Sequence, residues 1–151
     1  MEDKVRPKIC QGRFGRLAIP ASLVYLRSMI FRAIVVDRSL LAVNMYRLLL
    51  SPVVTTFLVA KRYEEARPWF FRRDKIDLAI FNSNTFGKKF DEYLDRFSKD
   101  EPLVRIPKIF LCREKEDEWV KKLKALPRTQ VVMRPFYPDD FLALVKRMTS
   151  K

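Results

Sequence analysis

The sequence predicts an α/β domain in which helices cover both faces of a doubly wound, five-stranded parallel sheet. Short runs rich in Ile, Val and Leu alternate along the chain with segments whose apolar residues recur every three or four positions. Short apolar runs are typical of buried parallel strands, which need crossover helices between them. The chain has 151 residues, of which 48% are hydrophobic, and this suffices for one ordinary domain with one core.

The first strand and the first helix are clearly marked. Residues 33–36 are Ala, Ile, Val and Val, and this run ends abruptly at Asp37. Ser39 is a suitable N-cap for a helix over residues 40–50. Four apolar residues of this helix recur at helical spacing and are expected to face the sheet: Leu41, Met45, Leu48 and Leu49.

The remaining elements alternate in the same way. Further strands are expected at residues 53–59, 76–81, 108–112 and 130–133. Further helices are expected at residues 63–72, 86–97, 116–126 and about 139–148. An aromatic stripe in the second of these helices is expected to be core: Phe86, Phe90, Tyr93, Leu94 and Phe97. Such a βα alternation predicts right-handed crossovers and a site at the carboxyl ends of the strands.

Composition limits the chemistry that the chain can perform. It has no histidine, and its two cysteines, Cys10 and Cys112, lack metal-ligand spacing, so the commonest general base and metal ligand are missing. We therefore expect a reducing, cytoplasmic location. The net charge of +13 would attract any acidic surface, including nucleic acid, without specificity. Arginines interrupt the apolar stretch 17–36, so no membrane span is expected.

Four segments carry a family resemblance. They read Val-Val-Asp at 35–37, IDLAIFNSN at 76–84, IPKIFLC at 106–112 and Arg-Pro-Phe at 134–136. In order and spacing they resemble the receiver domain of bacterial two-component response regulators, which has the CheY-like, flavodoxin-like fold. The resemblance covers residues 29–151 and leaves residues 1–28 as a basic N-terminal extension. One Gly-x-x-Gly run in that extension is only a weak indication of RNA binding.

The resemblance implies a phosphoryl site that this chain has lost. The family collects an acidic pair, an acceptor aspartate, a hydroxyl residue and a lysine at the strand ends. Here the acidic pair is Asp37 and Arg38, and Asn82 stands at the acceptor position, where an amide cannot form a stable acyl phosphate. Cys112 replaces the hydroxyl residue and Arg134 replaces the lysine. We therefore predict no enzyme activity, no cofactor and no metal site, because two arginines would repel a divalent cation.

Three further expectations follow from the same resemblance. Val131 stands where an aromatic switch residue is usual, and Pro135 is expected to follow a cis peptide bond. Asp37 is expected to pair directly with Arg134 or Arg38 through charge-assisted hydrogen bonds. Cys112 can also be an ordinary buried residue.

The predicted function is signalling by contact with protein partners, without phosphorylation. The resemblance places the partner face at Trp119, Lys122, Arg128 and Tyr137. Two alternatives remain open at this stage: a basic nucleic-acid-binding protein on the same scaffold, and a sensor that binds a small anion between Arg38 and Arg134. Weak electrostatic contact with nucleic acid and formation of a homodimer are also compatible with the sequence.

Overall fold

The computed structural model describes residues 32–72, 75–113 and 117–150. All of them lie within one structural unit, Phe31–Lys151. The predicted extension, residues 1–28, and most of the apolar stretch 17–36 lie outside the described residues.

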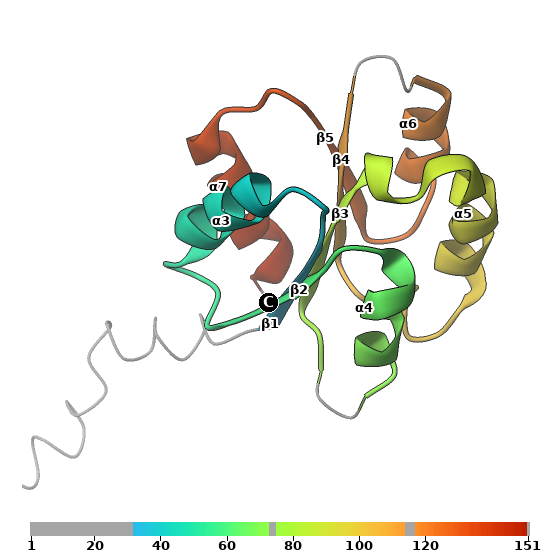
Figure 1. Cartoon of the computed structure of the whole chain (residues 1–151), viewed down its shortest axis with the longest axis horizontal. Coiled ribbons are helices and arrows are strands. Elements are labelled where there is room, and N and C mark those ends of the chain that lie inside the picture. Colours follow the sequence, from blue (N-terminus) through green and yellow to red (C-terminus); the bar gives the residue numbers. More distant parts are fainter. Residues whose placement is uncertain (1–31, 73–74, 114–116, 151) are drawn as a thin grey trace, which may run out of the picture. The chain divides into compact units, whose positions relative to one another are not determined.

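The described residues form one sheet with the strand order β2-β1-β3-β4-β5, in which every neighbouring pair is parallel (Figure 1). The strands are β1 Arg32–Val36, β2 Thr56–Ala60, β3 Leu78–Asn82, β4 Lys108–Cys112 and β5 Thr129–Met133. This order confirms the predicted doubly wound sheet. The chain moves outward to β2 first and then reverses toward β5, so the carboxyl ends of β1 and β3 lie side by side.

Helices cover both faces of this sheet. They are α3 Leu40–Leu50, α4 Tyr63–Phe70, α5 Phe90–Lys99, α6 Asp117–Lys124 and α7 Pro138–Thr149. Figure 1 shows α3 and α7 on one face and α4, α5 and α6 on the other. Two short 3-10 helices, η1 Ser83–Thr85 and η2 Gly87–Lys89, join β3 to α5.

Most predicted boundaries agree with the structure within a few residues, but the second strand begins later than predicted. Val53 and Val54 are buried in the turn after α3, where both backbone N–H groups donate to the Leu50 carbonyl. These two residues therefore complete the end of a helix and do not extend β2. Apolar β-branched residues have the same sequence signature in both settings.

The predicted inward face of α3 is wrong. Val43, Tyr46 and Leu50 are the buried residues of this helix, whereas Leu41 is 82% exposed and Leu48 is 78% exposed. Met45 is also exposed, and Leu49 is half-buried. The helix is apolar on nearly every side, so helical periodicity offers two stripes and cannot decide which one meets the sheet.

The largest part of the core lies between the sheet and α4, α5 and α6. The predicted stripe of α5 and the turn before it is buried as expected: Phe86, Phe90, Tyr93, Leu94 and Phe97. On α6, Leu123 is fully buried, and Trp119 and Val120 pack against the same cluster. Aromatic residues therefore supply most of the volume on this face of the sheet, where they pack against β3 and β4.

Lys108, the first residue of β4, is fully buried in this fold. Its ammonium donates to the Leu103 carbonyl at 2.6 Å and to the Ile106 carbonyl at 2.8 Å. Burial and, to a smaller extent, the positive charge of Arg128 together lower the pKa of Lys108 to about 8. The side chain thus closes the turn that precedes β4.

We expect the stability of the protein to rise with pH because of Lys108. Between the folded pKa of about 8 and the unfolded value near 10.5, the unfolded chain binds more protons, so raising the pH favours the folded state. The free energy of unfolding should increase by on the order of 1 kcal/mol between about pH 7.5 and about pH 9.5, as measured by urea denaturation. A Lys108→Met variant should lose this increase, and an equal increase in that variant would contradict the assignment.

Candidate functional site

The candidate site lies at the carboxyl edge of the sheet. Asp37 directly follows β1, Asn82 ends β3, Cys112 ends β4, and Arg134 directly follows β5. Carboxyl ends of parallel strands meet at one edge, and this geometry brings three of these residues into direct hydrogen-bonded contact. Cys112 is fully buried in the hydrophobic core.

A chain of hydrogen bonds joins Arg134, Asn82 and Asp37. An Arg134 guanidinium nitrogen donates to Asn82 Oδ1 at 3.2 Å, and Asn82 Nδ2 donates to Asp37 Oδ2 at 3.0 Å. Asp37 is 2% exposed and Asn82 is 6% exposed, so both contacts are shielded from water. Buried polar groups of this kind are stable only when they are paired, and here each partner satisfies the next.

Backbone groups hold the two inner members of this chain in place. The Ser39 backbone N–H donates to the other carboxylate oxygen of Asp37 at 2.9 Å, just before α3 begins. The Asn84 backbone N–H donates to Asn82 Oδ1 at 3.1 Å, so the Asn82 side chain also caps η1. Both ends of the Asn82 amide are therefore in use, which fixes its orientation.

The predicted direct pairing of Asp37 with an arginine is wrong. Within the described part of the chain, the Asp37 carboxylate has no ion pair with Arg134 or with Arg38. The Asn82 amide lies between carboxylate and guanidinium, because its donor end suits Asp37 and its acceptor end suits Arg134. Arg38 is exposed.

Tyr46 is a neighbour of the site that the sequence reasoning missed. It lies on the buried face of α3 and is 1% exposed. Burial, the negative charge of Asp37 and a hydrogen bond to its carboxylate together raise the pKa of Tyr46 to about 12, against the opposing effect of the Arg134 charge. The hydroxyl thus stays protonated beside the carboxylate. The error in the orientation of α3 is the reason that no sequence signal identified it.

The other predicted residues near the site have less direct roles. The peptide bond between Arg134 and Pro135 is cis, as the resemblance implies. The Arg134 backbone N–H donates to the Cys112 carbonyl at 2.9 Å, which continues the ladder beyond β5. Val131 is half-buried on β5 and packs against the aromatic core. One guanidinium nitrogen of Arg134, Nε, is buried without a hydrogen-bond partner among the described residues.

The described residues at this edge do not fit a magnesium ion. The ion prefers several anionic or neutral oxygen ligands in octahedral geometry. Asp37 supplies the only carboxylate of the hydrogen-bonded chain, and both its oxygens already accept hydrogen bonds. Both oxygen and nitrogen of the Asn82 amide are bound as well, and the guanidinium lies beside that oxygen. Among the described residues, no three acidic, cysteine or histidine side chains gather in one place.

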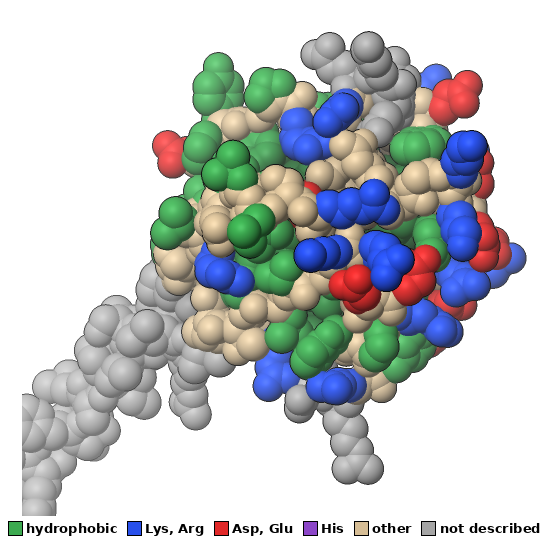
Figure 2. All heavy atoms as spheres, in the orientation of Figure 1, with side chains coloured by type: hydrophobic (Ala, Val, Ile, Leu, Met, Phe, Trp, Pro, Cys, Tyr) green, Lys and Arg blue, Asp and Glu red, His purple; other side chains and the backbone are tan. Residues whose placement is uncertain are grey.

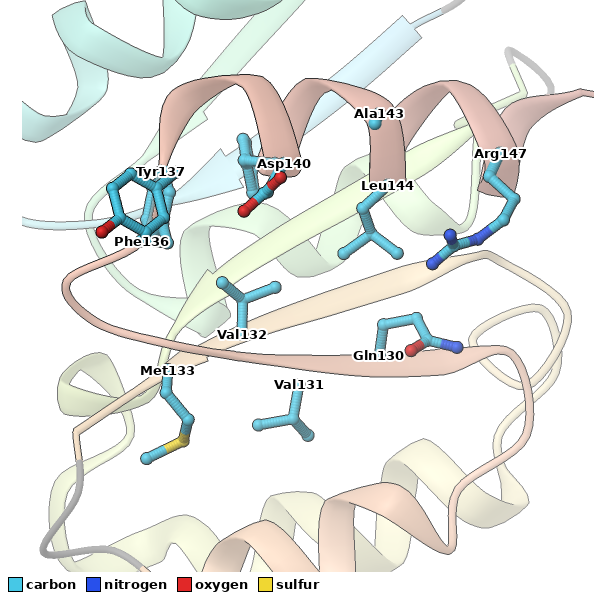
Figure 3. A pocket seen from close by; sticks show the side chains of 11 residues that line it. Gln130, Val131, Val132, Met133, Phe136, Tyr137, Asp140, Ala143, Leu144 and Arg147 are labelled. Carbon is cyan, nitrogen blue, oxygen red and sulfur yellow. The ribbon is translucent and has the colours of Figure 1, made fainter.

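A groove of about 530 Å³ lies between the edge strand β5 and α7. Figure 3 shows Val132 and Leu144 pointing toward each other across it, with Phe136 and Tyr137 at one end and Arg147 at the other. The groove is therefore apolar along its middle and polar at its ends. The groove is shallow, and its lining mixes apolar and polar side chains.

The four residues predicted as a partner face differ in how accessible they are. Tyr137 lines the groove and is 77% exposed. Trp119 is half-buried and stacks on Phe90 with ring centroids 4.1 Å apart. Lys122 bridges to Asp91 on α5 at 2.8 Å, and Arg128 donates to the Arg105 carbonyl at 3.0 Å. Three of the four thus have partners within the domain, and Tyr137 is the most available for an external contact.

Similarity to known proteins is found among solved structures and not among sequences. No protein family model and no curated protein sequence matches the chain. Solved structures do match. A signal receiver domain of a response regulator from Bacteroides fragilis has a TM-score of 0.67 and 13% identity, over 81% of this chain and 98% of the other. The chain has the receiver-domain fold.

Two other solved structures agree with this assignment. A response regulator from Thermotoga maritima matches with a TM-score of 0.62 and 22% identity, over 81% of this chain and 99% of the other. A putative response regulator from Chloroflexus aurantiacus J-10-fl matches with a TM-score of 0.67 and 17% identity, over 80% of this chain and 98% of the other. In this receiver fold, the hydrogen bonds that join Arg134, Asn82 and Asp37 lie at the carboxyl ends of the strands.

None of the helices among the described residues combines the length and the apolar character that crossing a bilayer needs.

Proposed function

We propose that this chain is a receiver-like signalling module that works through protein contacts and is not phosphorylated at Asn82. The observation that carries the proposal is the closed hydrogen-bonded chain from Arg134 through Asn82 to Asp37. A phosphate acceptor needs a nucleophilic oxygen that can approach the donor. Here the corresponding side chain is an amide, 6% exposed, with oxygen and nitrogen both engaged.

The same chain of contacts supports a fixed state of the domain. In a reversible switch, a covalent change would alter the contacts between strand ends and so shift two populations. In this protein, the Asn82 amide already provides a neutral bridge between the Asp37 carboxylate and the Arg134 guanidinium. We infer that the partner recognises one constant conformation, and that signalling depends on the amount of protein or on the partner.

The groove between β5 and α7 is the partner site that we favour. It has an apolar middle formed by Val132 and Leu144, and Tyr137 offers a large exposed ring at one end. Aromatic anchors that combine apolar area with a hydroxyl are enriched at protein interfaces. The other residues of the predicted partner face lie elsewhere, because Trp119 and Lys122 belong to α6 on the opposite face of the sheet and contact Phe90 and Asp91 of α5.

The phosphorylation part of the proposal predicts no reaction with a phosphodonor. Incubating the full chain with acetyl phosphate and magnesium should leave its intact mass unchanged, because Asn82 is an amide and both oxygens of the Asp37 carboxylate already accept hydrogen bonds. An Asn82→Asp variant treated in parallel locates the cause: phosphorylation of the variant alone would assign the loss to Asn82. A phosphoryl group on Asn82 or Asp37 of the natural chain would overturn the proposal.

The two alternatives have weaker support. A small anion between the arginines would lie beside the buried carboxylate of Asp37, and Arg38 is exposed rather than directed into the network. Nucleic-acid binding would draw on exposed cations, several of which pair with acids, as Lys99 does with Asp95 at 2.8 Å. Such pairing weakens the general electrostatic attraction of these cations to phosphate groups.

A further inference from the structure

The outer face of α3 is an apolar surface with no role in the candidate site. Leu40 is 74% exposed, Leu41 is 82% exposed and Leu48 is 78% exposed, with Met45 between the last two at 45%. Single exposed apolar residues are ordinary, whereas four on one short helix are not. Figure 2 shows hydrophobic side chains gathered on the side where Figure 1 places α3 and α7.

Three of these residues form a stripe with an approximate two-fold symmetry. Leu41 precedes Met45 by four positions and Leu48 follows it by three, so all three lie on one side of the helix. An antiparallel copy of the same helix, with the two-fold axis between positions 44 and 45, would place Leu41 opposite Leu48 of the second copy and bring the two Met45 side chains close together. The stripe is therefore self-complementary, as a two-fold symmetric interface requires.

The stripe carries no charge that would select a different partner. Arg47 is the only charged residue of α3, and it does not lie on the stripe. Its guanidinium lies over the Phe57 ring of β2, 5.5 Å from the centroid, and this contact draws it toward the sheet edge. A partner with acidic groups would find no cation on the stripe itself, because Arg47 lies to one side of it.

The area of this face suits a weak dimer. An exposed leucine-sized side chain contributes on the order of 100 Å² of apolar surface. The three stripe side chains on each of two copies would bury roughly 600 Å², with more from neighbouring atoms, which is below the range of stable interfaces and is typical of a weak, transient contact. We therefore expect association at a protein concentration of tens of micromolar or above, and not an obligate dimer.

From these observations we propose that two copies of this chain associate through antiparallel α3 helices, with Met45 beside the two-fold axis. The proposal is independent of the function proposed above, because α3 presents its opposite face, through Tyr46, to the site. Each copy has a net charge of +13, so repulsion opposes the dimer and salt relieves it. The dimer should consequently strengthen as salt is added, whereas a contact with an acidic partner would weaken.

Sedimentation equilibrium of the full chain tests the proposal. We expect the average mass to rise with protein concentration, and to rise at lower concentration in high salt than in low salt. A Leu41→Gln/Leu48→Gln double variant should remain monomeric at least ten-fold higher in concentration, because it removes apolar area without changing the charge. A Phe71→Gln variant provides the control, since Phe71 is 49% exposed at the end of α4 and lies outside the stripe.

Cross-linking tests the antiparallel register. In a Cys10→Ser background, a Met45→Cys variant should form cross-linked dimers with a short bis-maleimide. Leu41→Cys and Leu48→Cys should cross-link to each other when mixed, and much less to themselves. A chain that stays monomeric at several hundred micromolar in high salt would overturn the proposal, as would a dimer that the double glutamine variant leaves unchanged. Circular dichroism would verify that each variant is folded.

Discussion

Replacing Phe81 with alanine is expected to lower the free energy of unfolding by about 3–5 kcal/mol. Phe81 lies on β3 and is fully buried. Its ring centroid is 5.0 Å from that of Phe110, 5.1 Å from that of Phe97 and 5.6 Å from that of Phe86. Truncation removes these contacts and leaves a cavity among rigid rings that cannot collapse to fill it.

Urea denaturation followed by far-UV circular dichroism measures this change. Phe71→Ala is the matched control, because it removes the same side chain from a half-exposed position where a single arginine contact is lost. We expect the control to change the free energy of unfolding by less than about 1 kcal/mol. A Phe81→Ala variant that is as stable as the control would show that the aromatic cluster tolerates rearrangement.

The contrast between α5 and α3 explains how much of the fold could be predicted. On α5 the aromatic stripe alternates with charged residues, so only one face can be buried, and the prediction of Phe90, Tyr93 and Phe97 as core is confirmed. On α3 nearly every residue is apolar, and the sheet meets the face carrying Tyr46. Periodicity determines orientation only where polar residues oppose apolar ones.

The candidate site has a similar division. Its members could be named from the sequence because they follow apolar strand runs, and parallel strands bring such positions to one edge. The contacts among them depend on side-chain reach and donor geometry. An amide offers a donor and an acceptor at once, so Asn82 can bridge Asp37 and Arg134, which opposite charge alone would have paired directly.

Asn82→Asp should destabilise the protein, although it changes only an amide into a carboxylate. The substitution replaces the donor that faces Asp37 Oδ2 at 3.0 Å with an acceptor, and it places two buried carboxylates in contact. The loss of a buried hydrogen bond and the repulsion between like charges should lower the free energy of unfolding by about 2–4 kcal/mol near neutral pH. The guanidinium of Arg134 offsets only part of this, because it lies on the far side of residue 82.

The pH dependence of this loss identifies its electrostatic origin. Two neighbouring carboxylates raise the pKa of one of them above its unfolded value, so the folded variant holds a proton that the unfolded chain has released. The variant should therefore lie closest to the natural chain in stability near about pH 4.5 and fall behind it as the pH rises toward about 8. Asn82→Ala, which removes the same bonds without adding charge, should show a deficit that changes little with pH. An Asn82→Asp deficit of equal size at both pH values would mean that lost hydrogen bonding, and not charge repulsion, governs this edge of the sheet.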